Sequence, residues 1–278
     1  MSEARSGAQR SERFERGAAV LREMFPNRET NAALAVPEEI RRDFGIWTTE
    51  AAMGDVWARP GLSRRNRSLI TVAALTALHM PAELRVHALG ALRNGLSRRQ
   101  LGEIVMHVAG YAGFPIGVEG MRVLREAFDA APDLDPPEVQ DTSGPALGEL
   151  PEDRWERARA VLAVLMPRRN RAPLPVPEEM TPDWGRWVAM SAFGDLWSRP
   201  GLSLREHSRV VMTVLTVRHL PEELRLHIGV ARTLGISREE IGEQIMHLAV
   251  YGGFPVAVEA MRVARAAFDA EDGSEPAA

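Results

Sequence analysis

Apolar residues recur at helical spacing along most of the chain. After Ser63, which suits a helix N-cap, Leu69, Val72 and further apolar residues follow at the three- and four-residue steps of one helix face. Pro81 stands where a proline opens a helix, and Gly95 follows the end of that helix. No alternating segment is bounded by turn signals, so strands are not required. The pattern therefore predicts an all-α fold.

One unit of the sequence occurs twice. The string at residues 54–63 returns at 194–203, and the string at 107–115 returns at 247–255. The offset is a constant 140 without gaps from about residue 44 to residue 129, and about half of these positions are identical. A period of this length is too long for a solenoid repeat and indicates a duplicated domain.

The boundary between the copies is rich in proline, glycine and acidic residues and has no apolar periodicity. We therefore expect a first helical domain at 10–130, a linker at 131–150 and a homologous helical domain at 151–270. Each copy has the pattern of about six helices.

Two absences exclude whole classes of chemistry. The chain has no cysteine, which excludes disulfides, thiol nucleophiles and thiolate zinc sites. All 34 of its Lys and Arg residues are arginine, so it can form no Schiff base and carries no P-loop lysine. The net charge of -4, with arginines spread among acids, is not typical of a nucleic-acid-binding protein. With no apolar stretch near the roughly 20 residues of a membrane span and no signal core, we expect a cytoplasmic protein without membrane contact.

The most informative polar residues are those that both copies share on helices. Glu83 and His87 are four residues apart and so share a helix face, as do Glu223 and His227. A carboxylate beside an imidazole favours the imidazolium and fixes its orientation, which suits a proton donor or an oxyanion-stabilising group. The alternative is an ion pair on the helix surface, worth a few tenths of a kcal/mol.

A second shared pair is His107 with Tyr111, matched by His247 with Tyr251. These pairs could contact a substrate, or each tyrosine hydroxyl could be buried and satisfied by a neighbouring histidine. The other shared polar residues that we consider as substrate-binding are Asp55, Arg65 and Arg85, with their counterparts Asp195, Arg205 and Arg225.

Two further questions concern the partner of Arg59 and metal binding by the shared histidines. Arg59 could hold a substrate carboxylate, or it could pair with Asp55 one helical turn earlier. The shared histidines have spacings that match no metal motif, so we expect neither a metal nor a cofactor.

Three strings together resemble the carboxymuconolactone decarboxylase family. They are Gly-Asp-x-Trp-x-Arg-Pro-Gly-Leu-Ser at 54–63, Glu-Leu-Arg-x-His at 83–87 and His-x-Ala-x-Tyr-x-Gly-x-Pro at 107–115. The resemblance covers nearly all of each copy. It implies an all-α fold related to the alkylhydroperoxidase group and assembly into symmetric rings. Met80 and Glu83 stand where the peroxidase branch of this fold has cysteines, so peroxidase chemistry is excluded.

The resemblance implies a cofactor-independent lyase for a small molecule. The family reaction removes CO2 from a lactone that carries a carboxylate at its γ carbon, and the lactone itself accepts the electrons. The protein must hold the carboxylate, stabilise the oxyanion and return a proton. Three alternatives remain: an enolate-forming isomerase or cyclase, a non-catalytic binding paralogue, and a metal-dependent enzyme.

Differences between the copies and from the family add three expectations. Glu119 and Glu259 stand where the family has uncharged residues, so a less acidic lactone than a dicarboxylate is expected. Arg67 is replaced by His207 in the second copy, from which we expect the first copy to carry most of the activity. A trimer of tandem chains would reproduce a six-domain ring, so we expect a homo-oligomer of this kind.

Overall fold

The computed structural model describes residues 11–26, 36–167 and 177–273, and every regular element in these ranges is helical. The all-α prediction is thus confirmed. The first half contains α1 (Glu12–Met24), α2 (Glu38–Thr48), η1 (Thr49–Trp57), α3 (Arg64–Ala77), α4 (Pro81–Arg93), α5 (Arg98–Ala112) and α6 (Phe114–Asp129). The second half contains α7 (Arg154–Leu165), η2 (Glu178–Met180), α8 (Thr181–Val188), η3 (Ala189–Leu196), α9 (Leu204–Val217), α10 (Pro221–Thr233), α11 (Arg238–Gly252) and α12 (Phe254–Gly273).

Local signals in the sequence place the helix ends. The Ser63 hydroxyl accepts a hydrogen bond from the backbone N–H of Asn66 at the start of α3, as an N-cap residue should. Ser97 and Gln100 form a capping box at the start of α5, which satisfies two of the free amides there. Pro81 lies in the first turn of α4, where a missing N–H is harmless.

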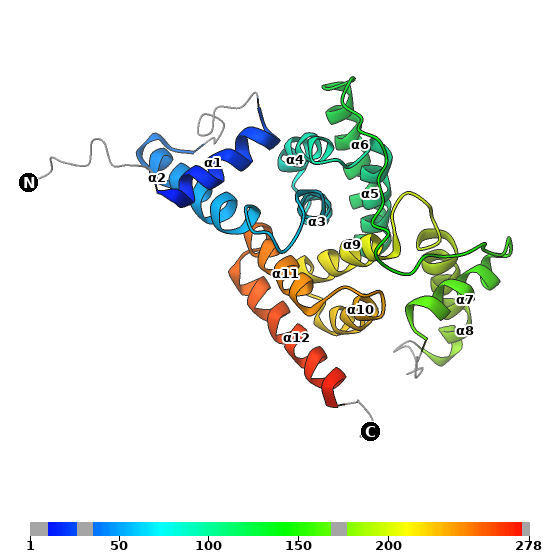
Figure 1. Cartoon of the computed structure of the whole chain (residues 1–278). Helices are drawn as coiled ribbons and strands as arrows, with labels where there is room; N and C mark the ends of the chain where they lie inside the picture. Colours follow the sequence, from blue (N-terminus) through cyan, green and yellow to red (C-terminus); the bar gives the residue numbers. More distant parts are fainter. Residues whose placement is uncertain (1–10, 27–35, 168–176, 274–278) are drawn as a thin grey trace, which may run out of the picture.

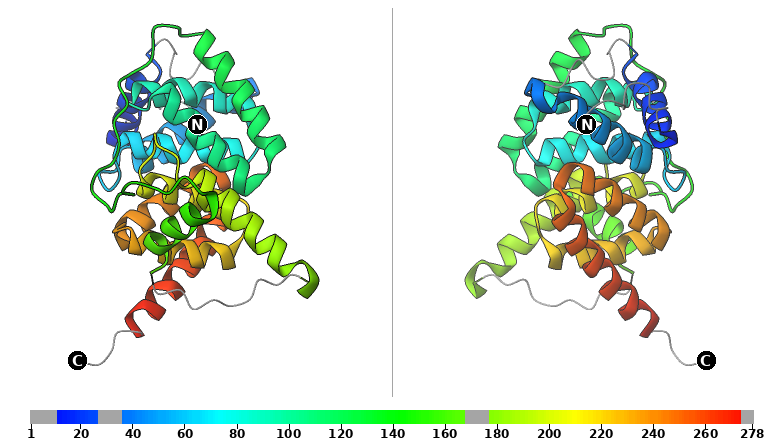
Figure 2. Two further views of the ribbon diagram at one scale, coloured as in Figure 1. Left: turned by 90° about the vertical axis from the view of Figure 1, so that its right-hand side faces the viewer. Right: turned by 90° about the vertical axis from the view of Figure 1, so that its left-hand side faces the viewer.

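The two halves share a core. Helices α3 and α9 lie side by side at the centre of the molecule (Figure 1), and every residue of α9 is buried. Val210, Val214 and Leu248 of the second half belong to the same apolar cluster as the buried residues of α3, α4 and α5. Figure 2 shows the first half stacked on the second. The predicted domains are therefore packed tightly against each other, which places α5 and α11 at the junction.

A close crossing of helices fixes the segment before each shared tryptophan. Helix α1 crosses η1 at Gly54, where a Cβ atom would lie 2.3 Å from the Arg13 carbonyl oxygen. At the equivalent crossing a Cβ atom on Gly194 would lie 2.6 Å from the Arg154 carbonyl oxygen. Only glycine fits at such distances, which explains the glycine in both copies. Both η1 and η3 are π-helices, a form often found at functional sites.

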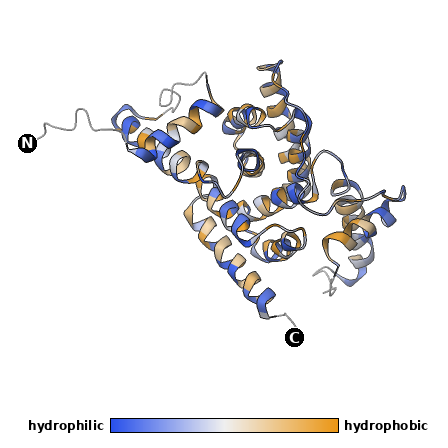
Figure 3. Ribbon diagram, viewed as in Figure 1, coloured by the Kyte–Doolittle hydropathy of each residue, from blue (hydrophilic) through white to orange (hydrophobic). Residues whose placement is uncertain are grey.

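The predicted linker and the end of the second half have distinct structures. Residues 131–153 form no helix. Helix α12 continues to Gly273, beyond the expected boundary at 270, and its last turn is hydrophilic (Figure 3). Glu271 and Asp272 of that turn pair with Arg238 at 3.1 and 2.5 Å. In the described part of the chain, no helix has the length and apolar character needed to cross a membrane.

Candidate active sites between the two halves

Each shared tryptophan meets a tyrosine from the other half. The Trp57 indole N–H donates to the Tyr251 hydroxyl oxygen at 2.9 Å. The Trp197 indole N–H donates to the Tyr111 hydroxyl oxygen at the same distance. Both tryptophans are fully buried. We call these two Trp–Tyr contacts the junctions. Each junction is composite, because it takes its tryptophan from one copy and its tyrosine from the other.

The predicted catalytic histidines complete these junctions. The His87 ring stacks on Trp57 with centroids 6.2 Å apart and meets the edge of Tyr251 at 5.6 Å. We call this cluster, with His247, the His87 site. Sequence proximity suggested no such partner, since Tyr111 is the tyrosine of the same copy as His87.

The second junction repeats this arrangement. The His227 ring stacks on Trp197 at 6.3 Å and meets the edge of Tyr111 at 5.7 Å. We call this cluster, with His107, the His227 site. The structure thus brings the predicted histidine and tyrosine residues together, in pairs that cross between the copies.

The two sites differ in how the deeper histidine is held. In the His87 site, the His247 ring lies 2.9 Å from the Thr71 hydroxyl through Nε2 and 3.5 Å from the Arg67 guanidinium through Nδ1. In the His227 site, His107 stacks on His207 with ring centroids 4.1 Å apart. Neither ring nitrogen of His107 has a hydrogen-bond partner in the described residues. The replacement of Arg67 by His207 therefore lies inside the site.

Burial keeps four of these histidines neutral, namely His107, His207, His227 and His247. It lowers the pKa of His227 to about 4 and that of His207 to about 4, from an ordinary value of 6.5. It also lowers the pKa of His107 and His247 well below that value. Neutral imidazoles are therefore the resting form at pH 7.

The expectation that Glu223 favours the imidazolium form of His227 is wrong. Glu223 is exposed, as is Glu83 in the first copy, and the lowered pKa of His227 comes from burial without a compensating carboxylate. A residue one helical turn away shares a face but need not share the environment. In this case the glutamate lies in water while the histidine lies in the core.

The shared aspartates hold the helix crossings. Asp55 accepts from the Arg13 guanidinium, with Nε 2.9 Å from Oδ1, and Asp195 accepts from Arg154 at the same distance. The alternative in which Asp55 pairs with Arg59 is therefore also wrong. Asp55 fixes η1 against α1 and Asp195 fixes η3 against α7, each next to the glycine that permits the crossing.

Arginine–glutamate pairs link the halves beside each site, and the sequence analysis missed the glutamates. The Arg199 guanidinium donates twice to Glu103, at 2.7 and 2.8 Å. The Arg59 guanidinium donates to Glu243 from Nε at 2.8 Å, and the fully buried Arg67 also donates to Glu243 at 2.8 Å. Both glutamates are identical in the two copies and lie on helices with a buried face, which is the signal that could have found them.

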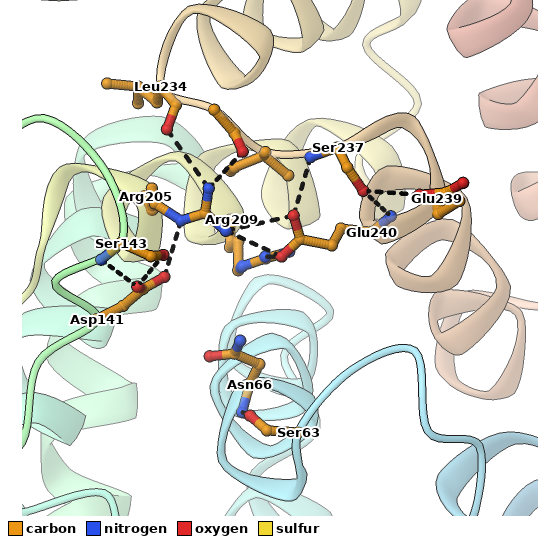
Figure 4. A network of polar contacts seen from close by, with 12 residues as sticks. Ser63, Asn66, Asp141, Ser143, Arg205, Arg209, Leu234, Ser237, Glu239 and Glu240 are labelled. Carbon is orange, nitrogen blue, oxygen red and sulfur yellow. Dashed lines mark hydrogen bonds and ion pairs between the residues drawn. The ribbon is translucent and has the colours of Figure 1, made fainter.

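Two of the shared arginines, Arg65 and Arg205, bind the linker. Arg205 bonds to Asp141 of the linker at 2.8 Å and to the Gly235 carbonyl at 2.5 Å, in a network that also holds Glu240 (Figure 4). Arg65 pairs with Glu206 and donates to the Val139 carbonyl, again on the linker. These two residues therefore fasten the linker and do not reach either site.

The remaining two predicted arginines lie in water. Arg85 is exposed on α4, and Arg225 is exposed on α10, where it pairs with Glu222 at 3.1 Å. Arg225 does not line the cavity beside His227. Their repetition in both copies therefore does not by itself point to a binding role.

A cavity of about 750 Å³ opens beside the His227 site. Its wall is mostly apolar and comes from α5 and α6 of the first half and from α8, η3, the segment after η3 and α10 of the second. The polar residues in that wall are Tyr111, Ser191, Asp195, Arg199 and His227. Within the described ranges, no three His, Cys, Asp or Glu side chains are placed to hold a metal ion.

Comparison with known proteins agrees with the resemblance seen in the sequence. The model of the Carboxymuconolactone decarboxylase family matches residues 42–126 and 182–266. The 4-carboxymuconolactone decarboxylase of Acinetobacter baylyi is 35% identical over 117 residues, which cover 42% of this chain and 87% of that protein. The nitrosuccinic acid decarboxylase of Metarhizium robertsii is 33% identical over 116 residues, 42% of this chain and 81% of that protein. The chain therefore belongs to the carboxymuconolactone decarboxylase family and carries the family's domain twice.

Proposed function

We propose that the chain is a cofactor-independent decarboxylase for a carboxylated lactone or a related enolisable acid. The observation that carries this proposal is the composite cluster of histidine, tyrosine and tryptophan at each junction of the two halves. Two relatives that match one copy of the domain are named decarboxylases. The reaction converts the carboxylate into CO2, leaves its electron pair on the unsaturated lactone as a dienolate, and adds one proton to carbon.

The tyrosine is the group suited to stabilise the dienolate oxygen. Burial raises the pKa of Tyr111 to about 12, so its hydroxyl stays protonated at pH 7. The Trp197 N–H occupies one lone pair of that oxygen and orients it, while the O–H hydrogen remains available for a substrate oxygen. In the His87 site the Trp57 N–H donates to the Tyr251 hydroxyl in the same way, and Tyr251 also bonds to Thr71.

The histidine is the group suited to return the proton. His227 lies in the cavity wall against Tyr111, and its pKa of about 4 means that the resting imidazole is neutral at pH 7, so the proton that it passes to carbon is one that it first takes up from solvent. An acid of that strength gives up its proton readily once a carbanion forms next to it. The apolar wall also favours the step, because a carboxylate loses more solvation there than a transition state whose charge is spread over the lactone.

The test is turnover of carboxymuconolactone, followed by its ultraviolet absorbance or by CO2 release. We expect His87→Gln combined with His227→Gln to lower kcat by about 100-fold or more, the usual contribution of a general acid. The matched control is Glu83→Gln combined with Glu223→Gln, which changes exposed residues on the same helices and should leave kcat within about threefold. Circular dichroism establishes that each variant is folded. Full turnover by the folded double histidine variant would refute the proposal.

A further inference from the structure

The cavity beside His227 has properties that a small dicarboxylic lactone does not require. We propose that this cavity binds a monocarboxylic acid with a long apolar body and discriminates against dicarboxylic acids. The inference rests on the proposed function in one respect only, because it takes the His227 cavity as a substrate site.

The size and lining of the cavity favour a ligand with a long apolar body. A volume of about 750 Å³ lies in the upper part of the roughly 300–1,000 Å³ range of sites that bury drug-sized ligands. Phe114, Met121, Val188 and Phe193 are among the apolar side chains of its wall. Each methylene that moves from water to such a wall tightens binding about fourfold.

The charge of the wall limits the number of carboxylates. Among the described residues that line the cavity, Arg199 is the one arginine, and Glu103 already neutralises it through two hydrogen bonds. Asp195 adds a negative charge that Arg154 balances. Because His227 is neutral, a single substrate carboxylate can approach only the Arg199 guanidinium, at the nitrogen that donates no bond to Glu103, and the wall offers no cation for a second.

The His87 site has more positive charge than the His227 site. There two guanidinium groups, Arg59 and Arg67, share the single carboxylate of Glu243, which leaves one positive charge in excess. In the second copy His207 replaces Arg67, and burial keeps that imidazole neutral. The two sites therefore differ by about one unit of charge, and the His227 site is the one that disfavours a second carboxylate.

The experiment is isothermal titration calorimetry of the full chain with hexanoate, octanoate, decanoate and decanedioate. We expect affinity to rise about fourfold for each added methylene from hexanoate to decanoate. Decanedioate should bind at least tenfold more weakly than decanoate, since its second carboxylate would enter the apolar wall. Equal binding of the two ten-carbon acids, or no dependence on chain length, would overturn the proposal.

Matched variants locate the binding. Met121→Glu places a carboxylate in the cavity wall, and Met261→Glu makes the same change at the equivalent position of the other half. Both side chains are exposed, at 37% and 39%, so both variants should fold. We expect Met121→Glu to weaken decanoate at least tenfold and Met261→Glu to leave it within twofold.

Two outcomes speak against the inference. Equal effects of the two variants would remove the assignment to this cavity. If Met121→Glu alters the number of chains per particle in sedimentation but not decanoate affinity, the cavity wall is an interface between copies. Because binding is measured without turnover, failure of this inference is distinguishable from failure of the proposed decarboxylation.

Discussion

Removing the carboxylate of Glu243 should destabilise the protein far more than removing its counterpart Glu103. In the His87 site, Glu243 holds both Arg59 and Arg67, and the Arg67 side chain is fully buried. Glu243→Gln leaves that guanidinium in the core without a counter-charge. Breaking a buried ion pair from one side costs about 3–5 kcal/mol.

The same change in the other half gives the comparison. Glu103 holds only Arg199, whose side chain is 36% exposed and can be hydrated once its partner is gone. We therefore expect Glu243→Gln to lower the free energy of unfolding by about 3 kcal/mol and Glu103→Gln by about 1 kcal/mol. For a chain of this size these values correspond to a loss in Tm of roughly 6–12 °C and 2–4 °C.

Differential scanning calorimetry gives the Tm of each variant, and urea unfolding gives the free energy at one temperature. Circular dichroism before heating checks that both variants are folded. Equal losses of Tm would show that the excess charge of Arg67 is tolerated without Glu243, and the electrostatic reasoning behind the difference between the two sites would fail.

Three further predictions concern pH, assembly and the inequality of the sites. Burial lowers the folded-state pKa of His207 and His227 to about 4, while the histidines of the unfolded chain titrate near 6.5, so stability should fall as pH drops from 6.5 to 4. The dependence of Tm on pH checks this, and His207→Gln should make that dependence weaker. Light scattering should give a trimer, consistent with one exposed tryptophan in each half, Trp47 in the first and Trp187 in the second. A stable monomer would contradict this prediction. Turnover of a dicarboxylic lactone should fall more in His87→Gln than in His227→Gln, and equal losses would contradict this order.

Local signals were sufficient for the elements and for the duplication. The N-cap at Ser63 and the proline at Pro81 act within a few residues, so they place helix starts without reference to the rest of the fold. The strict repeat, with no gap from about residue 44 to residue 129, likewise identified two similar units. The sequence also showed that both copies share the same histidines and tyrosines on their helices.

Only the tertiary structure decided which of these residues meet. The sequence paired His107 with Tyr111 and Glu83 with His87, because residues four apart share a helix face. The packing of α3 against α9 instead brings α11 to the first half and α5 to the second, so Trp57 meets Tyr251, 194 positions away. The same packing buries His227 and leaves Glu83 and Glu223 in water. Helical periodicity specifies which face is apolar but not which other apolar face covers it, and that choice determined the partners, the charges and the pKa values of both sites.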